Sequence, residues 1–266
     1  MGDHGTVHTH GGRSEVVSLS VSDYPVFEPK RQGRLTILIC TPDSQSPRFV
    51  RCYKSLCSTT RGMAYDLHIF DHRRRKDVSQ AAEINRALDI AEGPLLTMDD
   101  DVVLSGNWLP AMLAQLGPGV GIISPSTTFP DGRILSRGAT FRRNGSAALY
   151  RGEISAPIYV PCVGSCCSLI NTQALAGMRY SLEYQKYCFD PDMSFRLWER
   201  GLSTIVIPEI IIHDSGGTMR DLGINRKPLF RHDEEVFRKN WINTGRLDDV
   251  YERYSHHWPE ELRKIS

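Results

Sequence analysis

The chain has 266 residues, of which 40% are hydrophobic and 24% are charged, and its formal net charge is +1. This length and composition are typical of a soluble globular protein that buries one substantial core. The low net charge provides no overall field for nucleic acid, so we expect no nucleic-acid partner. No apolar run approaches the roughly 20 residues that cross a bilayer, so we expect no transmembrane segment.

The first 33 residues are polar, rich in Gly, His and Ser, and without sustained periodicity. They predict a flexible arm over residues 1–33, although residues 16–21 have the composition of a short strand. The arm lacks the apolar core of a signal peptide. The seven cysteines are odd in number and lie in apolar settings, which argues against a disulfide framework. We therefore expect a cytoplasmic protein, either free or peripheral to a membrane.

Strand and helix patterns alternate in the next part of the chain. Continuous apolar runs predict buried strands over residues 35–40, 67–70 and 95–98. Apolar residues at helical spacing predict helices over residues 47–58 and 78–91. This alternation predicts right-handed crossovers, and therefore an α/β fold with a Rossmann-like, mainly parallel central sheet flanked by helices.

The second half of the chain is less regular. Helices are expected over residues 108–116, 172–177, 193–200 and 233–241, and strands over residues 120–124, 159–170 and 204–212. The Pro-Asp-Gly-Arg sequence at residues 130–133 predicts a hairpin turn between short strands. No internal repeat and no interdomain linker is evident, so one large domain is the simplest organisation.

Three consecutive carboxylates, Asp99, Asp100 and Asp101, follow the strand over residues 95–98. Adjacent Asp residues repel one another and have poor strand and helix propensity, so folding alone does not account for them. Residues i and i+2 of a strand share one face, so two of these carboxylates could hold a divalent cation such as Mg²⁺ or Mn²⁺. An acidic turn or a helix N-terminus is the alternative.

Two other predicted strands also lead into polar residues, Thr41 and Asp71. Ligands of open parallel sheets bind beyond the carboxyl ends of the strands. We therefore expect Thr41, Asp71 and the three Asp residues to face one crevice. The sequence contains neither a GxxxxGK[ST] phosphate loop nor a dinucleotide-binding glycine fingerprint after the first strand, so a nucleotide would be held there through a metal.

Asp190 and His213 are further candidates for chemistry. Asp190 and Asp192 flank Pro191 just before a predicted helix, where Asp ordinarily caps the helix. Apolar neighbours could instead raise the pKa of Asp190 and make it a general base for a hydroxyl nucleophile. His213 ends the apolar strand over residues 204–212 and precedes a glycine loop, so it is either structural or within reach of a metal or phosphate.

Residues 35–241 resemble glycosyltransferase family 2, whose members are nucleotide-sugar transferases with the GT-A fold. The best-matching stretch, residues 82–101, is similar to the family's helix with an Asn (Asn85), the glycine that follows, an apolar strand and the DxD motif. Residues 130–136 are similar to a connecting segment of rhamnosyltransferase-like members. Residues 163–170 resemble the strand beside the acceptor pocket.

The resemblance implies a nucleoside-diphosphate sugar as donor and a divalent metal, Mn or Mg, as cofactor. Thr41 and Pro42 would line the nucleobase pocket, and Asp71 would hydrogen-bond the base. The full set of implied donor contacts is Thr41, Pro42, Asp71, Asn85, Asp99, Asp100 and Asp101. The implied metal ligands are Asp99, Asp101 and His213, with Asp101 the strongest.

The resemblance also implies an acceptor site and a catalytic base. Gly164 and Ser165 would contact the acceptor. Asp190 aligns with the carboxylate that acts as base in inverting members, where a Glu usually occupies the position of Phe189. The segment over residues 215–222 would close over the donor and limit hydrolysis.

The implied organisation is a GT-A domain over residues 34–245, with a nucleotide-binding half at about 34–104. An acceptor-binding half at about 105–245 would carry a smaller sheet region, and residues 246–266 would form a C-terminal tail. The implied reaction moves a sugar, a hexose or deoxyhexose, to a hydroxyl of a glycan, a lipid-linked glycan or a small metabolite, with inversion. The alternatives are a nucleotidyltransferase of similar architecture and a catalytically lapsed GT-A module that binds a sugar or a partner.

Overall fold

The computed structural model describes residues 4–10, 17–20, 34–72, 79–214, 219–220 and 222–265. The strands of these residues are β1 (His4–His10), β2 (Val17–Ser20), β3 (Leu35–Thr41), β4 (Tyr65–Asp71), β5 (Leu95–Asp99), β6 (Val102–Val103), β7 (Val120–Thr128), β8 (Ile134–Ser136), β9 (Ala139–Phe141), β10 (Ala147–Leu149), β11 (Ile158–Val160), β12 (Cys167–Ile170) and β13 (Ser203–His213). The helices are α1 (Pro47–Thr59), α2 (Gln80–Ile90), α3 (Trp108–Leu113), α4 (Thr172–Leu175), α5 (Phe189–Glu199), α7 (Arg226–Phe237), η1 (Arg238–Ile242), α8 (Arg246–Tyr254), η2 (Ser255–His257) and α9 (Glu260–Ile265).

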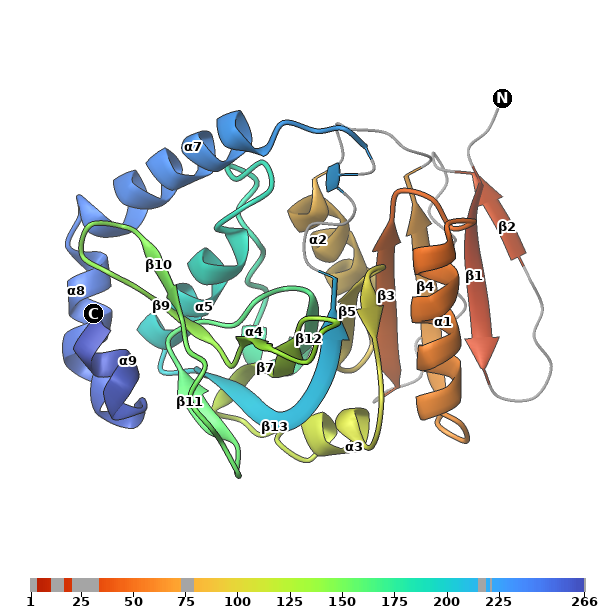
Figure 1. Ribbon diagram of the computed structural model, residues 1–266, viewed down its shortest axis with the longest axis horizontal. Coiled ribbons are helices and arrows are strands. Elements are labelled where there is room, and N and C mark those ends of the chain that lie inside the picture. Colours follow the sequence, from red (N-terminus) through yellow and green to blue (C-terminus); the bar gives the residue numbers. More distant parts are fainter. Residues whose placement is uncertain are drawn as a thin grey trace.

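Within the described ranges, the strands form an 11-stranded sheet in the order β11-β13-β7-β12-β5-β3-β4-β1-β2, with β6 paired to β13 and β8 to β7. β3 runs parallel to β4 and β5, and β7 runs parallel to β13, whereas β12 lies antiparallel between β5 and β7. A separate two-stranded sheet joins β9 and β10. The predicted α/β fold with a mainly parallel central sheet, flanking helices and a smaller sheet region is confirmed (Figure 1).

Local sequence explains the start of the first two helices. Ser46 caps α1 by accepting a hydrogen bond from the N–H of Phe49, and Pro47 occupies the first turn, where no backbone donor is needed. Ser79 caps α2 in the same way through the N–H of Ala82. Each helix therefore begins directly after its capping serine, and each buries one apolar face on the sheet.

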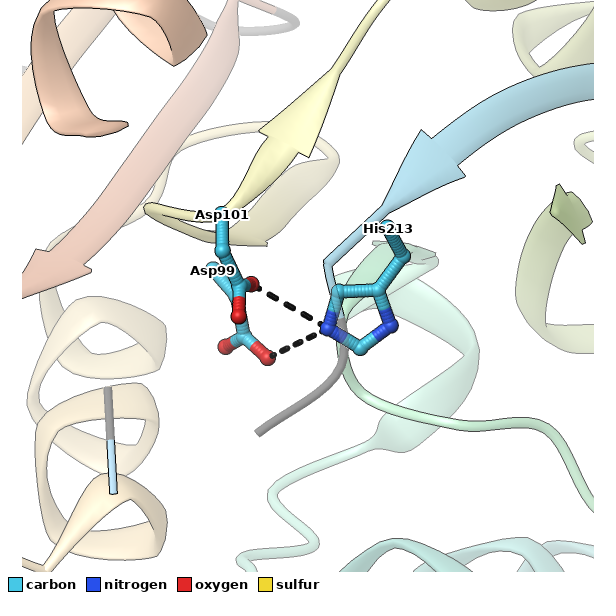
Figure 2. A group of neighbouring side chains, drawn as sticks. All are labelled: Asp99, Asp101 and His213. Carbon is cyan, nitrogen blue, oxygen red and sulfur yellow. Dashed lines mark ion pairs between the residues drawn. The ribbon is translucent and has the colours of Figure 1, made fainter. Parts of the chain in front are cut away.

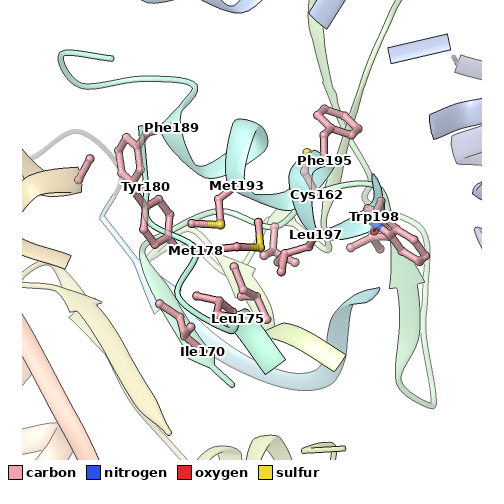
Figure 3. Packing of buried hydrophobic residues seen from close by; sticks show 14 of the residues in the cluster. Cys162, Ile170, Leu175, Met178, Tyr180, Phe189, Met193, Phe195, Leu197 and Trp198 are labelled. Atoms are coloured by element: carbon pink, nitrogen blue, oxygen red, sulfur yellow. Dashed lines mark hydrogen bonds between the residues drawn. The ribbon is translucent and has the colours of Figure 1, made fainter. Parts of the chain in front are cut away.

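Two cores lie on the two faces of the sheet. Ile37 and Ile39 of β3 contribute to the core beneath α1 and α3, whereas Leu38 contributes to the core beneath α2, α4 and α5. This alternation follows from the two-residue period of a strand. Figure 3 shows the second core around α5, where Phe195 and Trp198 are nearly inaccessible to solvent.

Prolines account for two of the differences between predicted and observed element bounds. The single strand expected over residues 159–170 is instead β11 and β12, which pair with different neighbours. Pro161 lies between them, and its missing N–H cannot continue a ladder of hydrogen bonds. Helix α5 begins at Phe189, before the predicted residue 193, because Pro191 sits in the first helical turn, where proline is accepted.

The two ends of the chain are more structured than expected. β1 pairs antiparallel with β4, and β2 with β1, inside the stretch for which the sequence indicates a flexible arm. The segment expected as a C-terminal tail forms α8 and α9, and Trp258 and Leu262 are buried against the second core. Figure 1 shows β1 and β2 at one end of the molecule and α8 and α9 at the other. Among the described helices, none combines the length and apolarity that crossing a bilayer requires.

Candidate active site

A cavity of about 880 Å³ opens at the carboxyl ends of β3, β5 and β13. Its volume is at the upper end of the range for small-molecule sites, which leaves room for more than one substrate. Residues from both halves of the chain line it. Of the site residues predicted from sequence, the cavity brings together Pro42, Asp99, Asp100, Asp101, Gly164, Ser165, Asp190 and His213.

Asp99, Asp101 and His213 converge at one end of this cavity, as Figure 2 shows. The Nε2 of His213 lies 3.1 Å from Oδ1 of Asp101 and 3.9 Å from Oδ2 of Asp99. One ligand atom from each of the three residues fits within 4.8 Å of the other two. The backbone sets this arrangement, because His213 pairs with Val102 in the β6–β13 ladder directly after Asp101.

The pKa values of Asp99 and His213 are both shifted in this cluster. Burial raises the pKa of Asp99, and the neighbouring Asp101 raises it further. Burial alone lowers the pKa of His213, but the facing Cys166 and Asp101 raise it, and the net shift is upward. The imidazole therefore acts as the counter-cation of the two carboxylates when no other cation is bound.

The donor set fits a divalent cation. Oδ1 of Asp101 is buried and accepts no hydrogen bond of normal geometry within the described residues, although it lies at ion-pair distance from His213. A buried carboxylate oxygen without such a donor is costly unless a cation satisfies it, either protonated His213 or a metal ion. Two carboxylates and one imidazole are ligands that suit Mn²⁺ and related metals, with open positions left for a substrate.

Asp100 does not share the orientation of its neighbours. It is 2% exposed, and its Oδ2 accepts a 2.9 Å hydrogen bond from the hydroxyl of Thr41. Burial raises the pKa of Asp100 to about 6. Because the carboxylate of Asp100 is hydrogen-bonded to Thr41 of β3, Asp100 supports the structure of the site.

Asp190 lies at another part of the cavity, in the first turn of α5. Its Oδ2 accepts a 3.1 Å hydrogen bond from the backbone N–H of Ser165, and it would lie 3.9 Å from a Cβ atom added to Gly164. Burial raises the pKa of Asp190 to about 6. A carboxylate with this pKa is ionised at neutral pH and basic enough to accept a proton from a hydroxyl group.

The backbone before Asp190 is strained. Cys188 has φ of 62°, in the left-handed region that non-glycine residues rarely occupy. Such conformations persist where the surrounding structure holds them, and they are frequent in functional sites. Here the strained turn aims the first turn of α5 at the cavity.

Three predicted donor contacts do not line the cavity. Thr41 is fully buried and turned toward Asp100. Asp71 accepts hydrogen bonds from the backbone N–H and the hydroxyl of Ser44, in the loop after β3. Asn85 exchanges two hydrogen bonds with the backbone of Tyr180 and joins α2 to the second core. The side chains of these three residues thus form hydrogen bonds within the protein, outside the lining of the cavity.

Among the cavity residues that sequence reasoning missed, two are polar residues close to the triad. Gln80 and Lys186 both line the cavity, and their side chains form a hydrogen bond with each other. Gln80 also donates to Asp99. No local sequence pattern indicates a site role for either residue, because Gln80 lies at the start of a predicted helix and Lys186 lies in an irregular stretch. The segment expected to close over the donor lies partly outside the described residues, at 215–218 and 221, while Met219 and Leu222 line the cavity.

A scan against protein-family models found no match. Among curated proteins, the chain is 24% identical over 198 residues to the uncharacterized protein y4gI of Sinorhizobium fredii. The match covers 67% of this chain, and the chain spans only 22% of that relative's length.

Among solved structures, the chain is similar to a mannosyltransferase, PcManGT from Pyrobaculum calidifontis, in complex with GDP-Man and Mn²⁺ (TM-score 0.44, 12% identity, 90% of this chain and 81% of that one). It is also similar to S. aureus TarS (TM-score 0.49, 10% identity, 84% and 73%). A third similar structure is a mutant of Drosophila beta-1,4-galactosyltransferase 7 in complex with manganese, UDP-Gal and xylobiose (TM-score 0.43, 14% identity, 68% of each chain).

Proposed function

We propose that this protein is a glycosyltransferase with the GT-A fold, and that it moves a sugar from a nucleoside-diphosphate sugar to an acceptor hydroxyl with inversion. One observation carries the proposal. The triad of Asp99, Asp101 and His213 opens on the same cavity as Asp190, a second carboxylate whose pKa is raised to about 6. A metal site and a separate base sharing one cavity are what direct displacement at a sugar carbon requires.

Asp99, Asp101 and His213 would hold Mn²⁺ or Mg²⁺. A cation bound there would neutralise the negative charge that develops on the departing nucleoside diphosphate. Asp190 would accept the proton of the acceptor hydroxyl as that oxygen attacks the anomeric carbon. The N–H of Ser165 keeps the Asp190 carboxylate in place, and the open surface of Gly164 leaves room beside it for the acceptor.

Two other functions make different predictions. A nucleotidyltransferase would release pyrophosphate, and a lapsed module would bind a sugar or partner without turnover. We favour transfer because Asp190 is half-buried in the cavity wall with its carboxylate oriented by a backbone donor, as a working base would be. The proposed acceptor is a glycan, a lipid-linked glycan or a small metabolite, and the proposed setting is the cytoplasm.

The test is a panel of UDP-, GDP- and dTDP-sugars, each with and without Mn²⁺, followed first by thermal shift and then by product analysis. We expect one donor class to raise the melting temperature only with metal, and we expect a nucleoside diphosphate to be released when acceptors are added. Release of pyrophosphate would identify a nucleotidyltransferase. The absence of any metal-dependent nucleotide binding would refute the proposal.

A further inference from the structure

The cavity is rich in carboxylates and poor in cations. Asp99, Asp101 and Asp190 line it together, and a diphosphate entering it would meet their negative field. One divalent cation at the triad offsets only part of this charge. A diphosphate site in this cavity therefore needs a further positive group within the protein.

Lys186 is placed to be that group. It lines the cavity, and its Nζ donates a 3.1 Å hydrogen bond to Oε1 of Gln80. The same Gln80 amide donates a 2.7 Å hydrogen bond from Nε2 to Oδ1 of Asp99. Gln80 thus fixes the distance between the ammonium group and the triad, and the ammonium has further donors for a ligand.

The charge of Lys186 acts on both ends of the cavity. Burial raises the pKa of Asp99 and of Asp190, and the positive charge of Lys186 opposes that rise at both carboxyls. The ammonium group therefore lies within electrostatic range of both the triad and the base. A diphosphate leaving group belongs in this region, because it must contact the metal while the attacked carbon faces the base.

The backbone of Lys186 is held by a buried acid. Asp233 of α7 has no exposed surface, and its carboxylate accepts the N–H groups of Gln185, Lys186 and Tyr187 at 2.8, 2.8 and 2.6 Å. Successive backbone N–H groups that converge on one anion form a rigid, preorganised turn. Through this turn, α7 fixes the start of the segment that leads to Asp190.

Arg226 is the other long cation among the described cavity residues, and its guanidinium is already engaged. Its Nε donates to the hydroxyl of Tyr187 at 2.8 Å, and its charge lies 5.6 Å from the centre of that ring. It is also exposed to solvent, which screens its charge. Lys186 is thus the better placed of the two.

We propose that Lys186 binds the diphosphate of the donor, and that Gln80 and Asp233 hold it in position. This inference rests on the proposed function, because it assumes a nucleoside diphosphate in the cavity. The complex would be stabilised by charge-assisted hydrogen bonds from Nζ to phosphate oxygens. Neither Lys186 nor Asp233 is needed to recognise the base of the nucleotide.

The experiment measures binding by calorimetry with Mn²⁺ present. UDP, GDP and dTDP are first tested on the wild-type protein, and the diphosphate that binds is compared with its nucleoside. Lys186→Met should weaken the diphosphate about 10- to 100-fold and the nucleoside by less than about twofold. Lys186→Arg should restore most of the diphosphate affinity, and Lys54→Met on the exposed face of α1 should behave as wild type.

The outcomes separate the two claims. If the wild-type protein binds none of the diphosphates, the proposed function and this inference both fall. If it binds one and Lys186→Met binds it equally well, or loses the nucleoside to the same extent, only the inference falls. A loss confined to Arg226→Met would likewise overturn it.

The positioning role of Asp233 has its own readout. Asp233→Asn should weaken diphosphate binding in the wild-type background and have no further effect in the Lys186→Met background, because both changes remove the same contact. Circular dichroism identifies variants that remain folded. Additive losses in folded variants would contradict a positioning role.

Discussion

The Nε2 of His213 lies 3.1 Å from Oδ1 of Asp101, although Asp101 lies in the turn before β6 and His213 ends β13, far along the sequence. The contact is built into the backbone, because His213 pairs with Val102 and the N–H of Asp214 donates to the carbonyl of Asp101 at 3.1 Å. The pairing of β6 with β13 therefore places the His213 imidazole and the Asp101 carboxylate side by side in the cavity. This geometry allows the metal site to be tested residue by residue.

Asp101→Asn and His213→Gln should each weaken Mn²⁺ binding by at least about 100-fold, because loss of a direct ligand costs no less than loss of the groups that support it. Asp100→Asn is the matched control within the same acidic triplet. Its carboxylate is bonded to Thr41, so its Mn²⁺ affinity should stay within about threefold of wild type. Calorimetric titration measures all three. Equal losses in Asp100→Asn and Asp101→Asn would show that only local charge matters.

Asp190 should set the acid limb of the pH–rate profile. Burial raises its pKa to about 6, and only the ionised form can accept a proton, so kcat/KM should fall as pH decreases through about 6. Asp190→Asn should lower kcat by about 10²- to 10⁴-fold and remove this limb, while the affinity for the nucleoside diphosphate is retained. A profile that keeps the limb in Asp190→Asn would assign the titration to another group.

Gly164 offers a test of the acceptor site that leaves the fold intact. A methyl group built on it meets only Oδ2 of Asp190, at 3.9 Å, and its φ lies outside the positive range. Gly164→Ala should therefore change the free energy of unfolding by less than about 0.5 kcal/mol. The added methyl narrows the cavity beside Asp190, so the KM for the acceptor should rise while the Kd for the nucleoside diphosphate does not change. A rise in the diphosphate Kd instead would place the donor there.

Asp192 should matter for stability and not for chemistry. It is 4% exposed, and its carboxylate accepts hydrogen bonds from Trp241 Nε1 and Arg196 Nε, each at 2.9 Å. Asp192→Asn leaves one of these buried donors without an acceptor and should lower the free energy of unfolding by about 2 to 4 kcal/mol. Asp89→Asn breaks an exposed pair with Arg179 and should cost less than about 1 kcal/mol. Urea denaturation compares the two, and equal losses would contradict the role given to burial.

The first strands and the acidic residues that follow β5 could be predicted from sequence because both depend on local order. Apolar runs bounded by turn residues located β3, β4 and β5, and the carboxyl ends of parallel strands meet at one edge. That reasoning placed Thr41, Asp71 and residues 99–101 in one crevice, and of these only residues 99–101 line the cavity. His213 was singled out separately, because it ends an apolar strand before a glycine loop. The break between β11 and β12 was missed because a run of apolar residues does not reveal which strand each part will pair with.

Contacts between distant segments could not be predicted. The sequence around Asn85 does not indicate whether its amide binds a ligand or the backbone of Tyr180. The packing of α2 determines that it binds Tyr180. Lys186 and Asp233 carry no local signal, since their roles depend on where α7 meets the turn before α5. Long-range polar contacts of this kind arise from tertiary structure alone.

The β6–β13 ladder has a consequence for folding. It joins a two-residue strand near the middle of the chain to the end of the long strand β13, so the two sides of the triad come together only once the large sheet has closed. A cation bound there would stabilise the closed sheet and not its separate parts, because ligands stabilise only the state that binds them. Metal affinity in this protein would thus report the integrity of the whole sheet, and damage far from the cavity would be felt as weaker metal binding.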